Sequence, residues 1–218
     1  MAEDGNGIGI GPGIDPEGKV TSLAALEAIY GAPNPTSLIK VADRITPEYQ
    51  AWIDASPFCA LATAGPEGLD VSPRGDRGAV ATVLEPRLLA LPDRRGNNRV
   101  DSLRNLIRDP RCALMFLVRD EDILIRVNGK GRVSVAPDLL ARFTVEGQAP
   151  RSVILVAVEE VYFQCARAVM RSGLWKPAEP RTERLPTAGE MLAAMSKGAE
   201  GGAEYDAVWR ERAAKTLW

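Results

Sequence analysis

Short apolar segments separated by polar turns dominate the middle of the chain. Residues 58–76 hold two such segments around a Gly-Pro-Glu-Gly turn, and residues 79–93 hold two more around Glu85 and Pro86. This pattern is typical of β-hairpins. The run at 112–118 is apolar throughout, which is typical of a strand covered on both faces. The middle of the chain is therefore predicted to form a sheet of short strands.

Two longer segments extend the predicted sheet. Side chains along residues 122–135 alternate, as they do in a strand with two different faces. One face carries Ile123, Ile125 and Val127, and the other carries Leu124, Arg126 and Asn128. Residues 152–163 supply the last long strand. The prediction is a mainly β protein with peripheral helices, in which about six antiparallel strands close into a barrel.

Helical spacing marks both ends of the chain and two points between the strands. Leu23, Leu26 and Ile29 repeat at helical intervals between a cap at Ser22 and a stop at Gly31. Further helices are predicted to open near Thr46 and Pro47, to cover 98–108 and 137–144, to follow a capping box at Thr187 and Glu190, and to carry Tyr205, Val208, Trp209 and Leu217. The helices are thus expected at the periphery of the sheet.

Three parts follow from this order of segments. Residues 1–38 are predicted to form an N-terminal arm and helix, residues 39–177 the barrel domain, and residues 178–218 a C-terminal helical extension. The glycine-rich stretch at 5–13 follows no strand and is predicted to be a flexible arm rather than a nucleotide-binding loop. The tail helices are short, and the apolar run at 152–158 has limited cover in a single barrel. Both features favour a sizeable apolar interface with a second copy.

Composition limits the chemistry that the chain can perform. None of the 218 residues is a histidine, which excludes Ser-His-Asp and Cys-His nucleophile activation, histidine zinc sites and histidine-ligated haem within one chain. Lys and Arg total 27 against 29 Asp and Glu, so no nucleic-acid partner is expected. With no long apolar run and no signal-peptide core, the protein is expected to be cytoplasmic, without membrane contact. Cys59, Cys112 and Cys165 lie in apolar runs and are expected to be buried free thiols, and no metal site is expected.

A helix is predicted to begin where the chain carries two adjacent asparagines. Asn98 is a good N-cap, and Asp101 lies three residues further on, where it can answer the cap. The predicted buried stripe of this helix consists of Val100, Leu103 and Ile107. The first backbone N–H groups of the helix would then lie beside a cluster of arginines.

That arginine cluster is a candidate phosphate site. Arg94, Arg95 and Arg99 would add positive charge and fork-shaped donors to the free N–H groups of the helix start. An alternative stays open, because Asp93 and Asp101 put negative charge nearby and an ordinary solvated helix start would look the same.

Two further segments could line a site. At the end of a predicted strand, VSPRGD at 71–76 combines a hydroxyl, a cation and a carboxylate with a backbone made irregular by Pro73 and Gly75. An ordinary polar turn is the alternative interpretation. After the last strand, Arg171 and Trp175 could reach the site of a neighbouring subunit, or could simply pack at the domain edge.

Four segments together resemble a known family. They are LATAGPEGLDVSPRGD, LALPDRRGNNRVDSLRNL, IRVNGKGRV and RSGLWKP, and in this order and spacing they are similar to the FMN-binding split-barrel proteins related to pyridoxamine 5′-phosphate oxidase. The resemblance covers residues 39–177 and implies a six-stranded split barrel, a homodimer, and two FMN sites in the clefts between the subunits.

The resemblance also implies which residues bind FMN. Arg74, Asn98 and Arg99 would hold the phosphate, and Leu91 and Pro92 would lie along the ribityl chain or the ring. Arg126, Arg171 and Trp175 would contribute from around the cleft or from the second subunit. The full set of expected cofactor-binding residues is Ser72, Pro73, Arg74, Gly75, Asp76, Leu91, Pro92, Arg94, Asn97, Asn98, Arg99, Arg126, Arg171 and Trp175.

The chain also departs from its relatives. The oxidase that names the family grips its substrate with a C-terminal arginine and histidine, whereas this chain has no histidine and a different tail. Gln164 stands where some relatives carry histidine, which argues against a role in handling haem. The expected function is therefore an FMN-dependent oxidoreductase acting on a small molecule that the sequence does not identify, with no catalytic residue assigned. The alternatives are a module that stores or senses a flavin or deazaflavin without turnover, and a structural barrel with an empty cleft.

Overall fold

The computed structural model describes residues 13–217, so the predicted arm at 5–13 lies outside the described part apart from Gly13. By its contacts the chain divides into two units, residues 1–41 and residues 42–218. The described part of the first unit contains two helices, α1 (Leu23–Tyr30) and α2 (Pro35–Ile39). As predicted, α1 starts after Ser22, whose hydroxyl accepts a hydrogen bond from the N–H of Ala25, and ends at Gly31.

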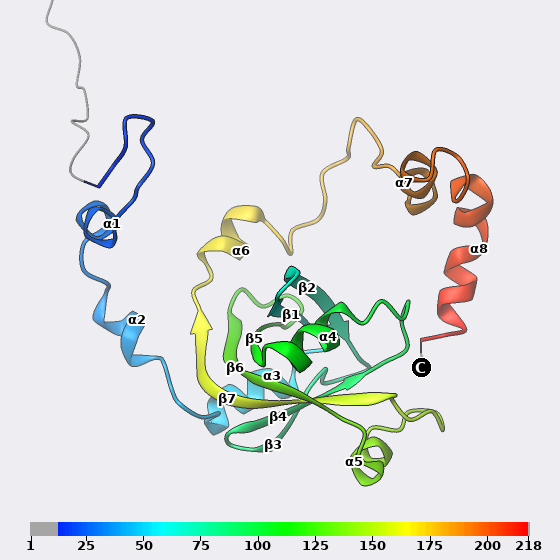
Figure 1. The fold of residues 1–218 in the computed structure, drawn as a ribbon, viewed down its shortest axis with the longest axis horizontal. Coiled ribbons are helices and arrows are strands. Elements are labelled where there is room, and N and C mark those ends of the chain that lie inside the picture. The colour runs from blue at the N-terminus through cyan, green and yellow to red at the C-terminus, as the bar shows by residue number, and fades with distance from the viewer. Residues whose placement is uncertain (1–12, 218) are drawn as a thin grey trace, which may run out of the picture. The chain divides into compact units, whose positions relative to one another are not determined.

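The second unit is built on one antiparallel sheet (Figure 1). Its strands are β1 (Phe58–Gly65), β2 (Gly68–Gly75), β3 (Thr82–Glu85), β4 (Leu88–Asp93), β5 (Arg111–Leu117), β6 (Leu124–Ser134) and β7 (Ser152–Gln164). They pair in the order β2-β1-β5-β6-β7-β4-β3. The sheet therefore has seven strands rather than about six, and each apolar segment predicted in the sequence forms one of them, the four-residue β3 included.

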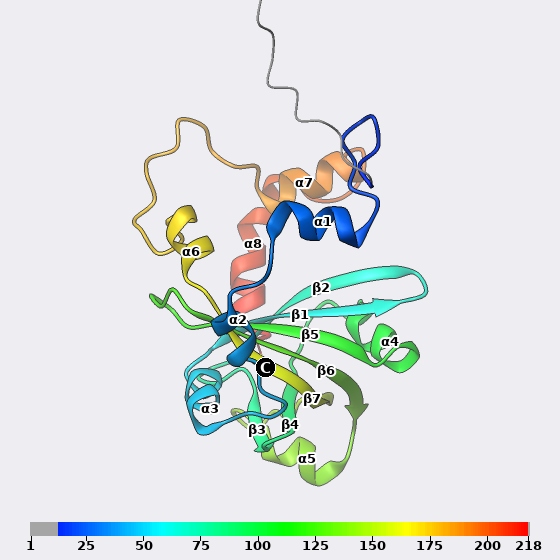
Figure 2. The ribbon, with the colours of Figure 1, turned by 90° about the vertical axis from the view of Figure 1, so that its left-hand side faces the viewer.

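The same order bears on the predicted barrel. The ladder ends at β2 on one side and at β3 on the other, and within residues 13–217 no strand pairing joins the two ends. A closed barrel is therefore not confirmed. Figure 2 shows the strands side by side from β2 to β7.

Helices precede, interrupt and follow the strands along the second unit. They are α3 (Pro47–Asp54), α4 (Asp101–Arg108), α5 (Pro137–Arg142), α6 (Arg167–Ser172), α7 (Ala188–Met195) and α8 (Gly202–Ala214). Of these, α4 lies against β1, β2 and β6. The predicted capping box is confirmed, since Thr187 and Glu190 bond reciprocally at the start of α7, and α7 packs against α8. None of the helices that the structure describes is both long and apolar enough to cross a lipid bilayer.

Strand β7 has buried apolar side chains on both of its faces. Ile154, Val156 and Val158 pack into the main core, whereas Val153 and Leu155 pack against Ala90 and Phe143 in a smaller second cluster. The expectation that residues 152–158 need cover from a second copy is therefore wrong, because α5 and the segment after it provide that cover within the chain.

Other burial predictions need correction. The strand at 112–118 is covered on one face only, and Met115 on its other face is 38% exposed. Cys59 and Cys112 are buried as expected, but Cys165 is exposed because it lies just beyond the end of β7. The apolar pattern of a strand thus does not show which of its apolar side chains another element covers and which face outward.

Candidate functional site

A pocket of about 760 Å³ lies between β2, at one edge of the sheet, and the end of β4. Its walls come from β2, from the end of β4 with the loop after it, from the first turn of α4 and from the start of β7. Nine of the residues predicted from the sequence line it: Ser72, Pro73, Arg74, Gly75, Pro92, Arg94, Asn97, Asn98 and Arg99. The structure therefore gathers two of the three candidate segments at one place.

Two crossed ion pairs join β2 to β4 beneath this pocket. Arg74 on β2 bonds to Asp93 at the end of β4, and both side chains are more than four-fifths buried. In the reverse direction, Asp76 just after β2 lies 2.7 Å from the guanidinium of Arg94 just after β4, with side-chain exposures of 5% and 13%. Arg94 also donates a 2.6 Å hydrogen bond to the carbonyl of Phe143. Side-chain ion pairs thus connect the two strands where no backbone ladder does.

The loop at 94–99, here called the arginine loop, turns sharply before the helix. Asn98 has φ 61° and Val100 has φ 52°, and both values lie in the left-handed region. The side-chain oxygen of Asn97 accepts a 3.0 Å hydrogen bond from the N–H of Arg99. The prediction that Asn98 caps the helix is wrong, because α4 starts only at Asp101 and the Asn98 side chain accepts instead from Arg151.

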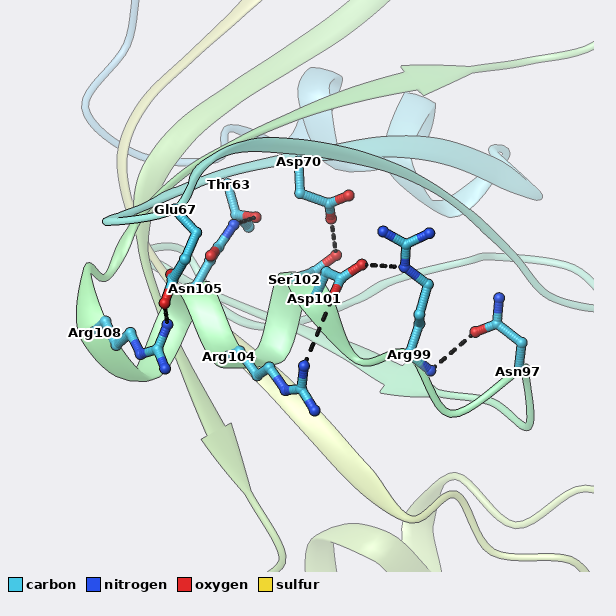
Figure 3. Close-up of polar contacts among 10 residues, drawn as sticks. All are labelled: Thr63, Glu67, Asp70, Asn97, Arg99, Asp101, Ser102, Arg104, Asn105 and Arg108. Carbon is cyan, nitrogen blue, oxygen red and sulfur yellow. Dashed lines mark hydrogen bonds and ion pairs between the residues drawn. The ribbon is translucent and has the colours of Figure 1, made fainter. Parts of the chain in front are cut away.

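The buried face of α4 also differs from the prediction. Val100 and Ile107 are exposed, at 40% and 77%, and Leu103 is half-buried. The helix instead buries Ser102, Asn105 and Leu106. The reason is local pairing: the Asn105 side chain donates to the Thr63 hydroxyl at 3.1 Å, and Ser102 bonds to Asp70 on β2 (Figure 3). A polar face of the helix therefore covers polar positions of β1 and β2.

The pocket carries an excess of positive charge. Five arginines line it against three aspartates. Arg74, Arg94 and Arg99 each have a carboxylate partner, whereas within residues 13–217 Arg95 forms no ion pair. Arg151 bonds only to the neutral amide of Asn98 in the same part of the chain. In this part of the chain the guanidinium groups of Arg95 and Arg151 thus have no carboxylate partner. A bound anion could neutralise their charge.

One buried hydroxyl in the wall has no partner. Ser152, opposite Asp93 in the β4–β7 ladder, is 5% exposed, and its Oγ makes no hydrogen bond to any residue that the structure describes. An unmade hydrogen bond of a buried polar group costs about 1–3 kcal/mol. The residue lines the pocket beside Arg151, so a polar ligand is the partner that the geometry lacks.

A smaller hollow of about 360 Å³ adjoins the pocket along α4. Figure 3 shows its arginines, of which Arg108 pairs with Glu67 and Arg104 lies 4.0 Å from Asp101. Three arginines and three carboxylates line this hollow. Its charges balance, so it does not by itself indicate a binding site for an anion.

Five predicted residues do not line the pocket. Leu91 is 1% exposed in the main core, and Asp76 lies behind Arg94. Arg126 lies over the ring of Tyr162 on the outer face of the sheet, at 5.1 Å from its centroid. Arg171 is exposed at the end of α6, and Trp175 donates a 2.8 Å hydrogen bond to the carbonyl of Glu121. For these five residues the cofactor role stays a prediction, although Asp76 contacts the arginine loop through Arg94.

Five polar residues of the pocket wall were not predicted as site residues from the motifs. They are Asp70, Asp93, Ser102, Arg151 and Ser152. Asp93 and Ser102 stand inside the segment that drew attention, but nothing in their spacing indicates their partners. The position of Arg151 and Ser152 beside the arginine loop depends on the pairing of β4 with β7, which the sequence does not display.

Comparison with known proteins identifies what the chain is similar to. The family model described as pyridoxamine 5′-phosphate oxidase matches residues 45–165. Among solved structures, a HupZ protein of Group A Streptococcus is 14% identical, with 55% of this chain and 93% of that chain covered and a TM-score of 0.46. A pyridoxamine 5′-phosphate oxidase-like protein of Lactobacillus delbrueckii is 23% identical, with 56% and 95% covered and a TM-score of 0.45. An F420 reductase is 17% identical, with 55% and 98% covered and a TM-score of 0.39. No curated protein matches the chain.

Proposed function

Because the chain belongs to the pyridoxamine 5′-phosphate oxidase family, we propose that it binds FMN in the pocket at the arginine loop and acts as an FMN-dependent oxidoreductase on a small molecule. Members of this family bind flavins and often act as oxidoreductases. A bound flavin supplies hydride or electron transfer, so the protein needs to bind and orient the ring rather than provide a nucleophile. That division of labour suits a chain without histidine.

The observation that carries this proposal is the combination of unneutralised charge and an unpaired hydroxyl. Arg95 and Arg151 would meet the charge of a phosphate group, and the Ser152 hydroxyl would donate to one of its oxygens. The first turn of α4 also lines this pocket, and the free N–H groups of a helix start favour an anion nearby. Arg74 and Arg94 also line the pocket, and through their carboxylate partners they hold β2 against β4, so their roles at the phosphate stay predictions.

Titration with FMN tests the proposal directly. The wild type is expected to bind FMN with the absorbance change of a bound flavin. In Arg95→Ala the loss of one charge-assisted hydrogen bond should weaken binding about 10-fold or more, and in Ser152→Ala the loss of a neutral one should weaken it about 2- to 10-fold. Arg119→Ala is the matched control, because Arg119 is 86% exposed and lies outside the pocket. Equal affinity in all four proteins would contradict this placement of the phosphate.

A storage or sensing module is the second candidate function. The titratable side chains that line the pocket among residues 13–217 are arginines and aspartates only, without cysteine, tyrosine or lysine. Such a wall offers few groups for proton transfer to a substrate. Anaerobic mixing of the FMN-loaded protein with NADH or NADPH separates the two candidates. Rapid bleaching of the flavin followed by reoxidation in air supports the oxidoreductase, and a spectrum that stays oxidised supports the module.

The homodimer that the sequence predicts has a candidate surface. Leu69 and Val71 on β2 are 86% and 67% exposed, and Phe58 on β1 and Met115 on β5 add further apolar area to the same face. Pro73, in register with Met115 across β1, links this face to the pocket. We propose that a second copy covers it, because a contiguous exposed apolar patch marks an interaction site.

Light scattering coupled to size exclusion checks the dimer. The wild type should elute as a dimer, and Val71→Asp should shift it towards the monomer because a carboxylate would be buried in the interface. Val135→Asp serves as the control, since Val135 is 66% exposed just beyond the end of β6. A monomeric wild type would refute the proposed pairing.

A further inference from the structure

Three hydrogen-bonded side chains form one end of the pocket. Ser102 on α4 donates to Asp70 Oδ2 at 2.5 Å, and the hydroxyl oxygens of Ser102 and Ser72 lie 2.9 Å apart. Arg74 Nε donates to Ser72 Oγ at 3.2 Å. All three residues Asp70, Ser72 and Ser102 line the pocket, and Figure 3 shows the contact of Asp70 with Ser102.

Asp70 fixes the direction of each hydrogen bond within this group of side chains. A carboxylate only accepts, so the single hydroxyl proton of Ser102 is committed to Asp70. The bond between the two serines must then use the proton of Ser72, with Ser102 accepting. Ser72 thus donates its only hydroxyl proton to Ser102 and uses one lone pair to accept from Arg74. One lone pair of the Ser72 oxygen remains for a ligand.

Asp70, Ser72 and Ser102 therefore offer a ligand only side-chain acceptors, and the Arg74 guanidinium beside them bonds to Ser72 and Asp93. Asp70, Ser72 and Ser102, here called the acceptor end, present lone pairs and no free proton. The pocket donors without a carboxylate partner in residues 13–217 include Arg95, Arg151 and the Ser152 hydroxyl. The acceptors therefore come from β2 and α4, whereas these donors come from the arginine loop and from residues 151 and 152.

We propose that Asp70 sets ligand specificity by this relay: it turns the Ser72 hydroxyl into an obligatory acceptor and so orients the ligand in the pocket. A phosphate oxygen facing the acceptor end would meet lone pairs and a carboxylate, which is a repulsive contact. A hydroxyl of a sugar-alcohol chain, or a ring N–H, would be bound there. The inference rests on the proposed function, in which the ligand is FMN, and it places the phosphate at the arginine loop and the donors of the ribityl chain or ring at the acceptor end.

The variant Asp70→Asn tests the relay. In either orientation of the new amide, its NH₂ group puts a donor where the wild type has none, either towards Ser102, which reverses the relay, or towards the ligand. Ser102→Ala is the second variant: it leaves the charge of Asp70 in place but frees the Ser72 proton to face the pocket. Asp109→Asn is the matched control, because Asp109 bonds to Arg111 outside the pocket.

The probes are riboflavin, which has the ring and the ribityl chain but no phosphate, and inorganic phosphate, measured by its competition with FMN. Asp70→Asn and Ser102→Ala should each weaken riboflavin about 2- to 10-fold, the equivalent of one hydrogen bond, and weaken FMN by the same factor. Neither variant should weaken phosphate. Arg95→Ala should do the reverse, weakening phosphate and FMN but not riboflavin, and Asp109→Asn should change none of the three.

The outcomes separate this inference from the proposed function. If the wild type binds FMN and riboflavin but Asp70→Asn and Ser102→Ala leave riboflavin unchanged, or weaken riboflavin and phosphate equally, the relay does not orient the ligand and the inference is overturned. If the wild type binds neither FMN nor riboflavin, the proposed function falls, and this inference falls with it. A Ser72→Ala/Asp70→Asn double variant that loses no more riboflavin affinity than Asp70→Asn alone would support the relay, since both changes then act through one hydroxyl.

Discussion

The crossed ion pairs between β2 and β4 allow a quantitative test of what holds these two strands against each other. Replacing Asp76 with alanine removes the carboxylate that lies 2.7 Å from the guanidinium of Arg94. The Arg94 side chain is only 13% exposed, so water cannot easily take the place of the carboxylate. The charge is then buried without that partner, which is far more costly than the pair itself is favourable.

The expected loss of stability follows from this burial. Removing one partner of a buried ion pair costs about 3–5 kcal/mol, and the partial exposure of Arg94 places this case near about 3 kcal/mol. For a chain of this size such a loss lowers Tm by about 6–12 °C. Arg94→Met in the Asp76→Ala background removes the buried guanidinium charge that has lost its carboxylate partner Asp76. The double variant should therefore be more stable than Asp76→Ala alone.

Urea unfolding followed by tryptophan fluorescence measures these free energies. Glu159→Ala is the control, because Glu159 pairs with Lys130 at 2.8 Å but both side chains are more than half exposed, and such a pair contributes under about 1 kcal/mol. An Asp76→Ala protein within about 1 kcal/mol of the wild type would refute the reasoning. So would a double variant less stable than Asp76→Ala, because the cost would then not come from a buried charge that has lost this carboxylate. A weakened affinity for FMN should accompany the loss, since Arg94 anchors the arginine loop.

Two further predictions concern the sheet and the thiols. A Cβ at Gly129 would lie 2.1 Å from a backbone carbonyl oxygen of β7, so Gly129→Ala should lower the free energy of unfolding in urea by about 1–3 kcal/mol. Gly96→Ala is the control, because a Cβ there would have nothing within 4 Å, and its stability should be near that of the wild type. Equal stabilities of the two variants would show that β6 and β7 can separate freely at this point. Burial raises the pKa of Cys59 to about 12 and that of Cys112 to about 11, so at pH 8 neither forms much reactive thiolate, whereas Cys165 is exposed. Mass spectrometry after brief alkylation of the native protein should therefore find one modified cysteine per chain and three after unfolding in urea, and rapid native labelling of Cys59 or Cys112 would contradict their burial.

Much of the fold could be predicted from the sequence because it depends on local pattern. The turns at Gly65–Gly68 and at Glu85–Pro86 separate the strands as expected, and the caps at Ser22 and Thr187 start their helices. The prediction of burial failed where the sequence pattern carries no information about which element covers a face of the sheet. The apolar residues of β7 look the same whether α5 or another subunit covers them, and those of β5 look the same whether one face or both are buried.

The start of α4 shows the limit of local reasoning most directly. Asn98 has the right chemistry for a cap, but its side chain accepts from Arg151, which lies far away in the sequence. The polar residues Ser102 and Asn105 are buried because Asp70 and Thr63 satisfy them, so tertiary pairing overrode the apolar stripe that spacing predicted.

By itself the sequence determined the class of the protein: a mainly β chain without histidine, with a concentration of arginine and amide at one strand end, and with the motifs of its family in order. Only the tertiary structure decided which of those arginines are committed to ion pairs and which are free to meet a ligand. The physical reason is that charge balance and hydrogen-bond direction depend on partners brought together by strand pairing. Arg74 with Asp93, Asp76 with Arg94, and Ser152 beside the arginine loop are neighbours in space alone.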